Sequence, residues 1–586
     1  MSTYRAPAED MIFVLEEIAG REQVAALPGF EDASADLVAA IIEEAGKLGT
    51  EVLDPINHSG DREGCTIENG VVRTPTGFKE AYQKFIDGGW NSMPFDPEYG
   101  GQGLPWLLST ATSEIWHAAN MSFGLCPLLT GGAAELLSEH GSDDLKATFL
   151  EKMISGVWTG TMNLTEPQAG SDLARIRTKA TRDGDHYRIF GQKIFITYGE
   201  HDFTDNIVHM VLARTPDGPD GIKGISLFVV PKFLVNEDGS LGPRNDLRCA
   251  SIEHKMGINA SPTAVMLYGE NEGAVGYIVG EENRGIEYMF TMMNNARLAV
   301  GLEGVAIAER AYQRARTFAE DRTQGRTIDG KSREAVPIIH HPDVKRMLLS
   351  MRAQTEAVRA LAYFVASNLD IAHRHENPEV AHKAQVFVDL LTPVVKAWST
   401  DVGVDVANTG IQIHGGMGFI EETGAAQHFR DARIAPIYEG TNGIQANDLV
   451  ARKIGREGGV TAKLLIAEMR SSLDSMASSH AKMTAAIDAL ERATDWIVSN
   501  FEAELETALA GAVLYQRLMG ITVGGWLMVR SLEIVQQKRD QYPDFADRKL
   551  ASVRYFARYI LIEADGLASA VIDGSSAITQ TALKDL

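Results

Sequence analysis

NLTEPQAGSD, at residues 163–172, decides the fold because it opens a β-rich stretch in an otherwise helical chain. Pro167 and Gly170 enforce a turn within it. Thr165, Ser171 and the free backbone N–H groups of such a turn could contact a polar ring edge and a phosphate. Taken alone, the stretch fits a hydrogen-bonded turn at a strand entry better than a ligand site, so its meaning depends on the rest of the chain.

The apolar pattern differs before and after this stretch. Between residues 11 and 18, apolar residues stand at i, i+3, i+4 and i+7, the spacing of an amphipathic helix. After residue 158, short runs of β-branched and aromatic residues alternate with Asp-Gly turns at 183–184, 217–218 and 238–239. These runs, at 187–190, 193–197, 207–213, 225–230 and 263–267, predict strands. This spacing of short strands is typical of a barrel or a sandwich.

Helical periodicity returns from residue 285 to about residue 455, and Gly458-Gly459 suits a hinge before a further helical segment. A chain of 586 residues exceeds one compact core. We therefore expect an N-terminal helical domain at 1–157, a β-domain at 158–280, a helical bundle at 281–457 and a helical extension at 458–586.

The overall charge narrows the possible partners. With 55 Lys and Arg against 79 Asp and Glu, the formal net charge is −24. Binding to nucleic acid or to an anionic membrane surface needs clustered cations, so both are disfavoured. The cysteines at 65, 126 and 249 are far apart without CxxC spacing, which is typical of buried thiols in a reducing compartment.

Targeting and membrane signals are weak. The first residues lack the apolar stretch of a signal peptide. The apolar run at 518–529 has twelve residues, too few to cross a bilayer, so we expect a buried helix there. These features together favour a cytoplasmic protein.

A candidate general base lies in IYEGTNGIQ, residues 437–445. Glu439 stands among apolar neighbours just before a Gly-Thr turn, where desolvation would raise the pKa of its carboxyl and make it a better base. Many carboxylates precede turns without any chemical role, so this stretch also needs support from elsewhere.

Two further stretches could contact a planar cofactor with a pyrophosphate. In Phe195-Ile196-Thr197, an aromatic ring followed by a hydroxyl at a strand end can flank a ring system, although such a triplet is more often part of a core. Arg322, after a helix that ends near Ala319, could reach a pyrophosphate. The alternative for Arg322 is a favourable cation at a solvated helix C-terminus.

A glycine-rich stretch, QIHGGMGF at residues 412–419, permits close approach of the backbone to a ligand. It lacks the GxGxxG spacing of a dinucleotide-binding turn, and His414 within it is more often structural than catalytic. The histidines at 340, 341, 373 and 375 are not at metal-ligand spacing with carboxylates, and no GxSxG motif occurs. We therefore expect neither a metal site nor a serine hydrolase.

These stretches, in this order, resemble the acyl-CoA dehydrogenase family of flavoenzymes over about residues 35–455. The most specific matches are TEPQAGSD at 165–172 and RDARI at 430–434 continuing to YEGT at 438–441. The resemblance implies a mainly α fold with a central β-domain: a helical domain, a β-barrel or sandwich, and a four-helix bundle. The C-terminal helical extension resembles that of the longer members.

The resemblance also implies roles for residues. Glu439 is the catalytic base. FAD is held by Thr165, Ser171, Thr197, Thr441 and Gln445. The FAD of a neighbouring subunit is contacted by Arg322, Gln412 and Gly416, which implies a homodimer or homotetramer. Substrate contacts fall to Arg297, Asn294 and Tyr438.

Two positions depart from the family pattern. The family usually has Phe after the glutamine that corresponds to Gln324, and this chain has Gly325. Some branches place the base at the position of Ala296, which cannot titrate, and this strengthens the expectation for Glu439.

The activity implied is FAD-dependent α,β-dehydrogenation of an acyl-CoA thioester to the trans-2-enoyl-CoA, with an electron-transfer flavoprotein as acceptor. The opening YRAPAEDM, residues 4–11, resembles the bacterial branch that acts on 3-methylmercaptopropionyl-CoA in dimethylsulfoniopropionate demethylation. Alternatives are a general short- to long-chain fatty acyl-CoA dehydrogenase, an oxidase that uses O2, a nucleic-acid-associated member, which the charge disfavours, and a non-catalytic flavin-fold interaction protein, which would be expected to lose the base.

Overall fold

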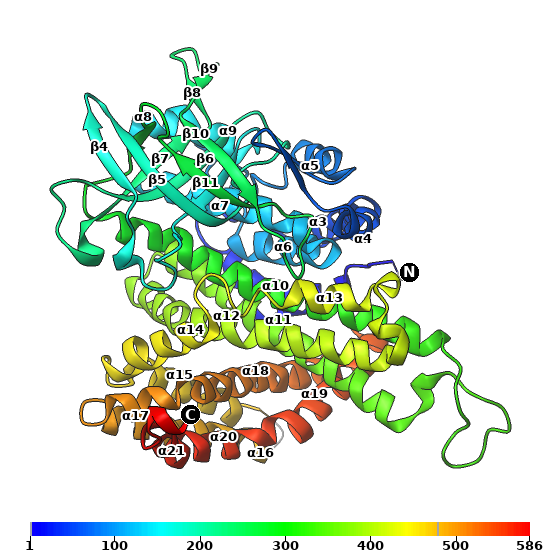
Figure 1. Cartoon of the computed structure of the whole chain (residues 1–586). Coiled ribbons are helices and arrows are strands. Elements are labelled where there is room, and N and C mark those ends of the chain that lie inside the picture. Colours follow the sequence, from blue (N-terminus) through cyan, green and yellow to red (C-terminus); the bar gives the residue numbers. More distant parts are fainter. Residues whose placement is uncertain (1–2, 477–479) are drawn as a thin grey trace. The chain divides into compact units, whose positions relative to one another are not determined.

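The computed structural model describes residues 3–476 and 480–586 (Figure 1). The chain folds into two compact units. Unit 1 consists of residues 1–46, 105–118 and 297–586, and unit 2 consists of residues 47–104 and 119–296. Each unit therefore combines segments that are distant in the sequence. The four consecutive domains expected above stay a prediction.

Unit 2 is built on an eight-stranded sheet, and most of its strand pairs are antiparallel. Seven strands follow the order β10-β11-β5-β12-β7-β6-β3, and β4 pairs with β5 and β6. The strands are β3 (Thr159–Asn163), β4 (Lys179–Asp183), β5 (His186–Thr197), β6 (Ile207–Arg214), β7 (Ile225–Pro231), β10 (Leu247–Ile252), β11 (Thr263–Tyr268) and β12 (Ala274–Ile278).

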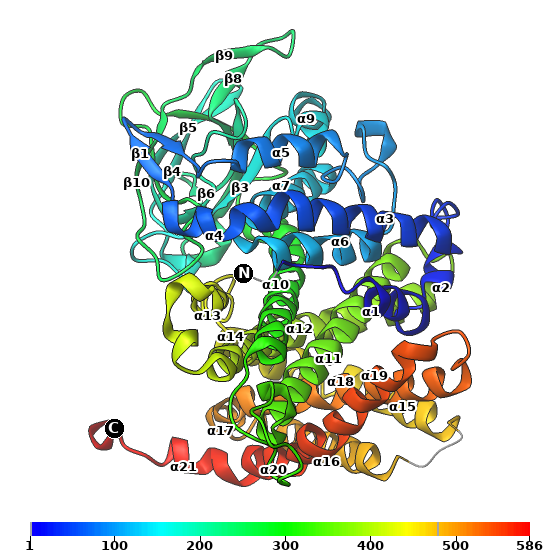
Figure 2. The ribbon, with the colours of Figure 1, turned by 90° about the vertical axis from the view of Figure 1, so that its right-hand side faces the viewer.

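Helices pack beside this sheet because small residues let them come close. Helix α7 (Met121–His140) lies against β3, where a side chain at Gly160 would sit 2.5 Å from the Cβ of Ala133. The Gly160 N–H donates to Thr130 Oγ1 at 3.2 Å. Two further helices of the unit, α4 (Asp54–Glu63) and α5 (Phe78–Asp87), are visible in Figure 2.

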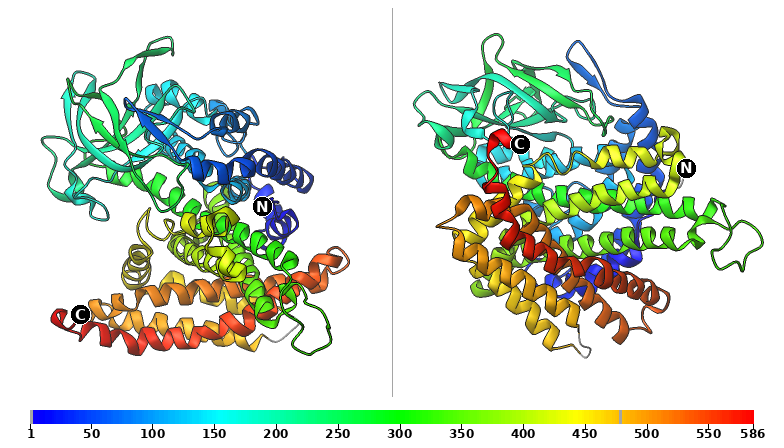
Figure 3. Two further views of the ribbon diagram at one scale, coloured as in Figure 1. Left: turned by 45° about the vertical axis from the view of Figure 1, so that its right-hand side comes forward. Right: turned by 60° about the horizontal axis from the view of Figure 1, so that its bottom comes forward.

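Unit 1 is helical, and its longest helices are α11 (Pro342–Arg374), α12 (Pro378–His414) and the part of α10 (Gly285–Asp321) from Arg297 onward. Helices α11 and α12 run side by side (Figure 3). Glycines bring α10 onto α12: a Cβ at Gly304 would lie 2.2 Å from the carbonyl oxygen of Ser399. This close approach matters below, because both helices carry residues around Glu439.

The extension belongs to the same unit. Its helices are α15 (Val460–Asp474), α16 (Ala481–Asn500), α17 (Leu505–Ala510), α18 (Ala512–Gln537), α19 (Pro543–Tyr555), α20 (Ala564–Ser569) and α21 (Ser575–Thr579). Among the described residues, α18 alone is long and apolar enough to cross a membrane, but 83% of its apolar window is buried. Gly520 and Gly524 of α18 receive the ring of Trp398, as expected of a core helix.

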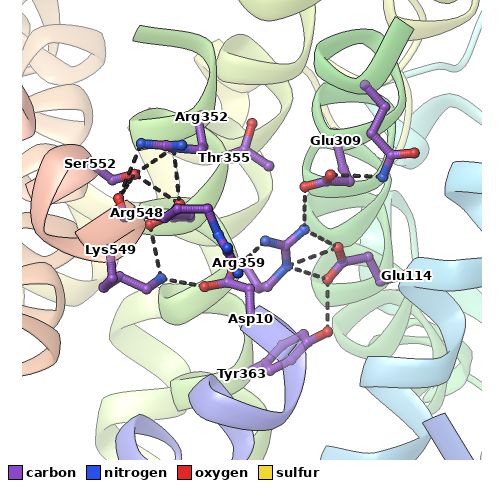
Figure 4. A network of polar contacts seen from close by, with 12 residues as sticks. Asp10, Glu114, Glu309, Arg352, Thr355, Arg359, Tyr363, Arg548, Lys549 and Ser552 are labelled. Atoms are coloured by element: carbon purple, nitrogen blue, oxygen red, sulfur yellow. Dashed lines mark hydrogen bonds and ion pairs between the residues drawn. The ribbon is translucent and has the colours of Figure 1, made fainter. Parts of the chain in front are cut away.

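A buried ion network ties the N-terminal segment and the extension to α11 (Figure 4). Arg359 binds Glu114 at 2.6 Å, Glu309 at 2.8 Å and Asp10 at 2.6 Å. Lys549 of α19 contacts Asp10 as well, and it binds Glu356 at 2.9 Å. Removing one member of such a network would leave the others buried and unpaired, which costs about 3–5 kcal/mol.

Candidate active site

Glu439 lies in a strained turn between α13 (Ala425–Ala432) and α14 (Asn442–Asp448). Its φ angle is +55°, in the left-handed region that non-glycine residues seldom adopt, and Gly440 follows at +81°. Thr441 then caps α14 by accepting the Ile444 N–H at 3.2 Å. Such strain persists only where the surroundings hold the backbone firmly, and it is common at functional sites.

Two buried side chains donate hydrogen bonds to the backbone carbonyls of this turn. Gln445, fully buried on α14, donates to the Glu439 carbonyl at 3.0 Å. Lys396, fully buried on α12, donates to the Gly440 carbonyl at 2.8 Å and to Asn442 Oδ1 at 2.9 Å. The carbonyls on both sides of the Glu439–Gly440 bend are therefore fixed by separate helices.

A third contact holds the residue before the base. The hydroxyl of Tyr438 donates to Oε2 of Glu303, which is fully buried on α10. The other oxygen of that carboxyl, Oε1, has no hydrogen-bond partner in the described part of the chain. Glu303 is thus a buried carboxyl with one polar contact.

The charges around Glu439 suit a base that titrates near neutrality. Burial raises the pKa of Glu439 to about 7, and the positive charges of Arg297 and Lys396 oppose that rise. Burial likewise raises the pKa of Glu303 to about 8, against the hydrogen bond from Tyr438 and the charge of Lys396. Arg297 is half-buried, and its Nε has no hydrogen-bond partner among the described residues.

The other expected residues of unit 1 gather where α10 and α12 end. The His414 ring stacks on Phe318 of α10 with centroids 4.3 Å apart, which brings the start of the 412–419 stretch close to Arg322. Gln412, Gly416 and Arg322 are all exposed. His414 also contacts the Gly410 carbonyl at 2.7 Å, which is the structural role that its sequence context favours.

The departure at Gly325 has a local explanation. Its φ angle is +72°, so glycine is favoured there, and its carbonyl accepts the Val336 N–H at 2.8 Å. A phenylalanine at this position would be strained.

In unit 2 the turn that follows β3 is anchored by a buried glutamate. Glu166 binds Lys193 at 2.9 Å and also accepts hydrogen bonds from Thr178, Arg177 N–H and Gln168. Burial alone would raise the pKa of Glu166, but the charge of Lys193 and these hydrogen bonds outweigh it and lower the pKa to about 2. The ionised pair therefore fixes the loop that carries Thr165 and Ser171.

Strand β5 brings Thr197 close to that loop. The Ile194 N–H donates to the Thr165 carbonyl at 2.9 Å, and Thr161 of β3 donates to the Thr197 carbonyl at 2.7 Å. The pairing of β5 with β11 is irregular here, and Phe195 has a φ angle of +60° with 59% of its surface exposed. Bulges of this kind re-aim side chains beside functional sites.

The candidate cofactor residues of each unit are compatible with contacts to a flavin nucleotide. In unit 2 the exposed ring of Phe195 stands two residues before Thr197 in β5, and a Cβ at Gly170 would meet nothing within 4 Å, so a phosphate chain can approach the backbone. In unit 1, Gly416 is equally open, and the buried Oε1 of Gln445 has no partner among the described residues and can accept a hydrogen bond.

The structure brings Glu439, Tyr438, Thr441, Gln445 and Arg297 together in unit 1, and Thr165, Ser171 and Thr197 in unit 2. Asn294 is exposed on α10, in the part of that helix that belongs to unit 2. Sequence reasoning missed Glu303 and Lys396 around the base, and Lys193 behind the flavin loop. Each is a single charged residue in an apolar run or in a strand, and this pattern could have indicated a buried charge. Within the described ranges no group of three His, Cys, Asp or Glu side chains could hold a metal.

Comparison with known proteins agrees with this geometry. Family models match three consecutive ranges: the acyl-CoA dehydrogenase N-terminal domain at 36–157, its middle domain at 161–270 and its C-terminal domain at 283–454. A fourth, described as acetyl-CoA dehydrogenase C-terminal like, matches 465–582.

Relatives cover nearly the whole chain. A 3-methylmercaptopropionyl-CoA dehydrogenase of Ruegeria pomeroyi is 48% identical over 98% of this chain and 99% of its own. The broad-specificity linear acyl-CoA dehydrogenase FadE5 of Mycobacterium tuberculosis is 32% identical over 96% of both. The fold matches that of Caenorhabditis elegans ACDH-11 in complex with C11-CoA, with a TM-score of 0.79 at 19% identity over 99% of this chain and 96% of that one. The chain therefore belongs to the acyl-CoA dehydrogenase family of FAD-dependent enzymes.

Proposed function

We propose that this enzyme dehydrogenates 3-methylmercaptopropionyl-CoA to methylthioacryloyl-CoA, with Glu439 as the base. The observation that carries the substrate is the 48% identity with the Ruegeria pomeroyi enzyme along essentially the full length of both chains. A general fatty acyl-CoA dehydrogenase is the second candidate, because FadE5 and a butyryl-CoA dehydrogenase of Syntrophomonas wolfei also align along 96% or more of the chain, at 32% identity.

The chemistry requires removal of a weakly acidic proton from the carbon next to the thioester carbonyl. Glu439 takes this proton on its carboxylate, and the raised pKa makes that carboxylate a stronger base than an exposed one. FAD, when bound, accepts the β-hydrogen together with its electron pair as a hydride.

The surroundings of Glu439 balance two requirements. The base must be strong, which burial provides, and it must still be ionised near neutral pH, which Arg297 and Lys396 support. The hydrogen bonds that residues 438–440 make with Glu303, Gln445 and Lys396 hold the backbone that carries the carboxylate. Positioning of this kind contributes a large part of the rate of such reactions.

The remaining residues take the roles that the family resemblance implies. Thr165, Ser171, Thr197, Thr441 and Gln445 hold FAD, while Arg322, Gln412 and Gly416 contact the FAD of a second subunit in a homodimer or homotetramer. Arg297, Asn294 and Tyr438 line the path of the acyl-CoA. An electron-transfer flavoprotein in the cytoplasm reoxidises the enzyme.

The substrate is tested by recording the visible spectrum of the purified protein without oxygen. Separate samples receive 3-methylmercaptopropionyl-CoA, butyryl-CoA and palmitoyl-CoA, and the rate of flavin bleaching is compared. The proposal predicts fastest bleaching by 3-methylmercaptopropionyl-CoA. Faster bleaching by butyryl-CoA or palmitoyl-CoA would support the fatty acyl alternative, and oxygen consumption by the reduced enzyme at a comparable rate would indicate an oxidase.

A further inference from the structure

Glu303 is a buried titratable group that the proposed reaction leaves without a role. It stands within an apolar and small-residue run of α10, LAVGLEGVAIA at 298–308, where a charged residue costs stability. Among residues 3–476 and 480–586 no ion pair compensates it, and its one hydrogen bond in those ranges is with the residue directly before the candidate base.

The backbone of the base needs such contacts. A glutamate in the left-handed region is strained, and the surroundings must offset that strain. Gln445 holds the Glu439 carbonyl and Lys396 holds the Gly440 carbonyl, so both act on or after the base. The hydrogen bond from Tyr438 to Glu303 instead fixes the residue directly before the base.

We propose that Glu303 is a positioning residue for Glu439: its buried carboxyl holds the Tyr438 hydroxyl on α10 and, with Lys396 and Gln445, fixes the left-handed backbone of the base. The inference rests on the proposed role of Glu439. Helix α10 suits this task because Gly301 and Gly304 let it pack closely against α12, the helix that carries Lys396.

The carboxyl also shares an electrostatic environment with the base. Tyr438, Glu439 and Lys396 face Glu303, and Lys396 in turn interacts with Asp401 and Arg297. While Glu303 keeps its proton, the surroundings of Glu439 hold one negative charge fewer. Ionisation of Glu303 at higher pH places a second anion there, which opposes the negative charge that develops on the thioester.

The test compares variants in the FAD-loaded protein. Flavin reduction by 3-methylmercaptopropionyl-CoA or butyryl-CoA is followed by anaerobic stopped flow in the wild type, Glu303→Gln, Glu303→Ala, Tyr438→Phe and Glu439→Gln. Asp370→Asn is the matched control, because Asp370 is also a buried carboxyl of unit 1 with its pKa raised, to about 7, and caps α6 (Trp106–Ala119) by accepting the Trp106 and Leu107 N–H groups. FAD content, acyl-CoA dissociation constant and Tm are measured for each variant.

Loss of positioning should lower the rate constant and leave binding nearly unchanged. We expect Glu303→Ala and Tyr438→Phe to slow flavin reduction by about 10–100-fold, and the acyl-CoA dissociation constant of Glu303→Ala, which has no proposed contact with the substrate, to stay within about threefold of wild type. A double variant that combines Glu303→Ala with Tyr438→Phe should be no slower than the slower single variant, since both substitutions remove the same contact. Glu303→Gln, whose amide still accepts the Tyr438 hydroxyl, should recover most of the loss, and Asp370→Asn should react like the wild type.

The pH profile separates this role from simple packing. In the wild type the rate should rise through pH 7 and fall above about pH 8, whereas Glu303→Gln should keep the rise and lack the fall. Wild-type rates and profiles in Glu303→Ala and Tyr438→Phe, with Glu439→Gln inactive, would overturn the inference and leave the proposed function standing. A reactive Glu439→Gln would instead overturn the proposed function.

Discussion

Glu166 of unit 2 and Glu303 of unit 1 are both buried behind a loop that carries candidate site residues, but their surroundings are opposite. Glu166 receives five hydrogen bonds, one of them from the Lys193 ammonium, and its pKa falls to about 2. In the described part of the chain, Glu303 accepts one hydrogen bond, from a hydroxyl, and its other oxygen has no partner; burial raises its pKa to about 8.

The number of partners distinguishes a carboxylate that anchors the backbone from a carboxyl that can exchange a proton. A carboxylate that is fully paired stays ionised at every physiological pH and acts as a fixed anchor for the backbone. A buried carboxyl with few partners binds its proton more tightly: burial raises the pKa of Glu303 to about 8 and that of Glu439 to about 7, so Glu439 can exchange a proton near neutral pH. Two carboxyls of raised pKa therefore lie where the proposed reaction needs a proton acceptor.

The largest expected effect comes from breaking the anchor in unit 2. Lys193→Met removes the cation that compensates Glu166 and should lower the free energy of unfolding by about 3–5 kcal/mol, because the carboxylate stays buried without its charge partner. Chemical denaturation measures this change. The control is Lys179→Met, at an exposed position of β4, which should change stability by less than about 0.5 kcal/mol. Equal stabilities of the two variants would show that the pair does not hold the loop.

A smaller effect, opposite in sign for the two glutamates, should follow from removing each charge alone. Since the folded-state pKa of Glu303 lies above its unfolded value, the stability that this group contributes is present below about pH 4 and is lost as pH rises through 8. Glu303→Gln should therefore become more stable relative to wild type as pH rises from 4 to 8, by at most about 1.4 kcal/mol for each unit of the pKa shift.

Glu166 should behave in the reverse way. Its folded-state pKa is lowered, so its contribution is present above its unfolded pKa and is lost as pH falls through about 2. Glu166→Gln should therefore be less stable than wild type at neutral pH, and the two should converge in acid. Denaturation curves at several pH values measure both variants. A pH trend of the same sign in both would contradict the comparison.

The smallest effect concerns the rate in the unmodified enzyme. Because Glu439 must be ionised to take a proton, the rate constant for flavin reduction should fall about tenfold for each pH unit below 7. Anaerobic stopped flow between pH 5 and pH 8 gives this profile. A rate that is independent of pH down to pH 5 would place the pKa of the base near that of an exposed glutamate.

The strands with strong β patterns could be predicted closely from sequence. The runs 207–213, 225–230 and 263–267 correspond to β6, β7 and β11, each within one residue. The two runs 187–190 and 193–197 are one strand, β5, since the intervening Gly191 and Gln192 continue its pairing with β11. Strand β4, KATRD, is mostly exposed and polar, so no apolar alternation marks it.

The candidate site was predictable only where local chemistry differs from ordinary helix or strand. Glu439 before a Gly-Thr turn and the TEPQAGSD turn are such places. Glu303 and Lys396 were not found, because each lies within a helix whose apolar period is otherwise regular, and only the tertiary approach of α10 to α12 brings both to the base. The left-handed backbone of Glu439 is likewise a consequence of tertiary contacts.

The most direct test of the central claim is the anaerobic spectrum of Glu439→Gln after addition of acyl-CoA. The account predicts a yellow protein with wild-type FAD content and Tm that binds the thioester, while its flavin bleaches at least about a thousandfold more slowly than that of the wild type. Bleaching within about tenfold of the wild-type rate would contradict the assignment of Glu439 as the base.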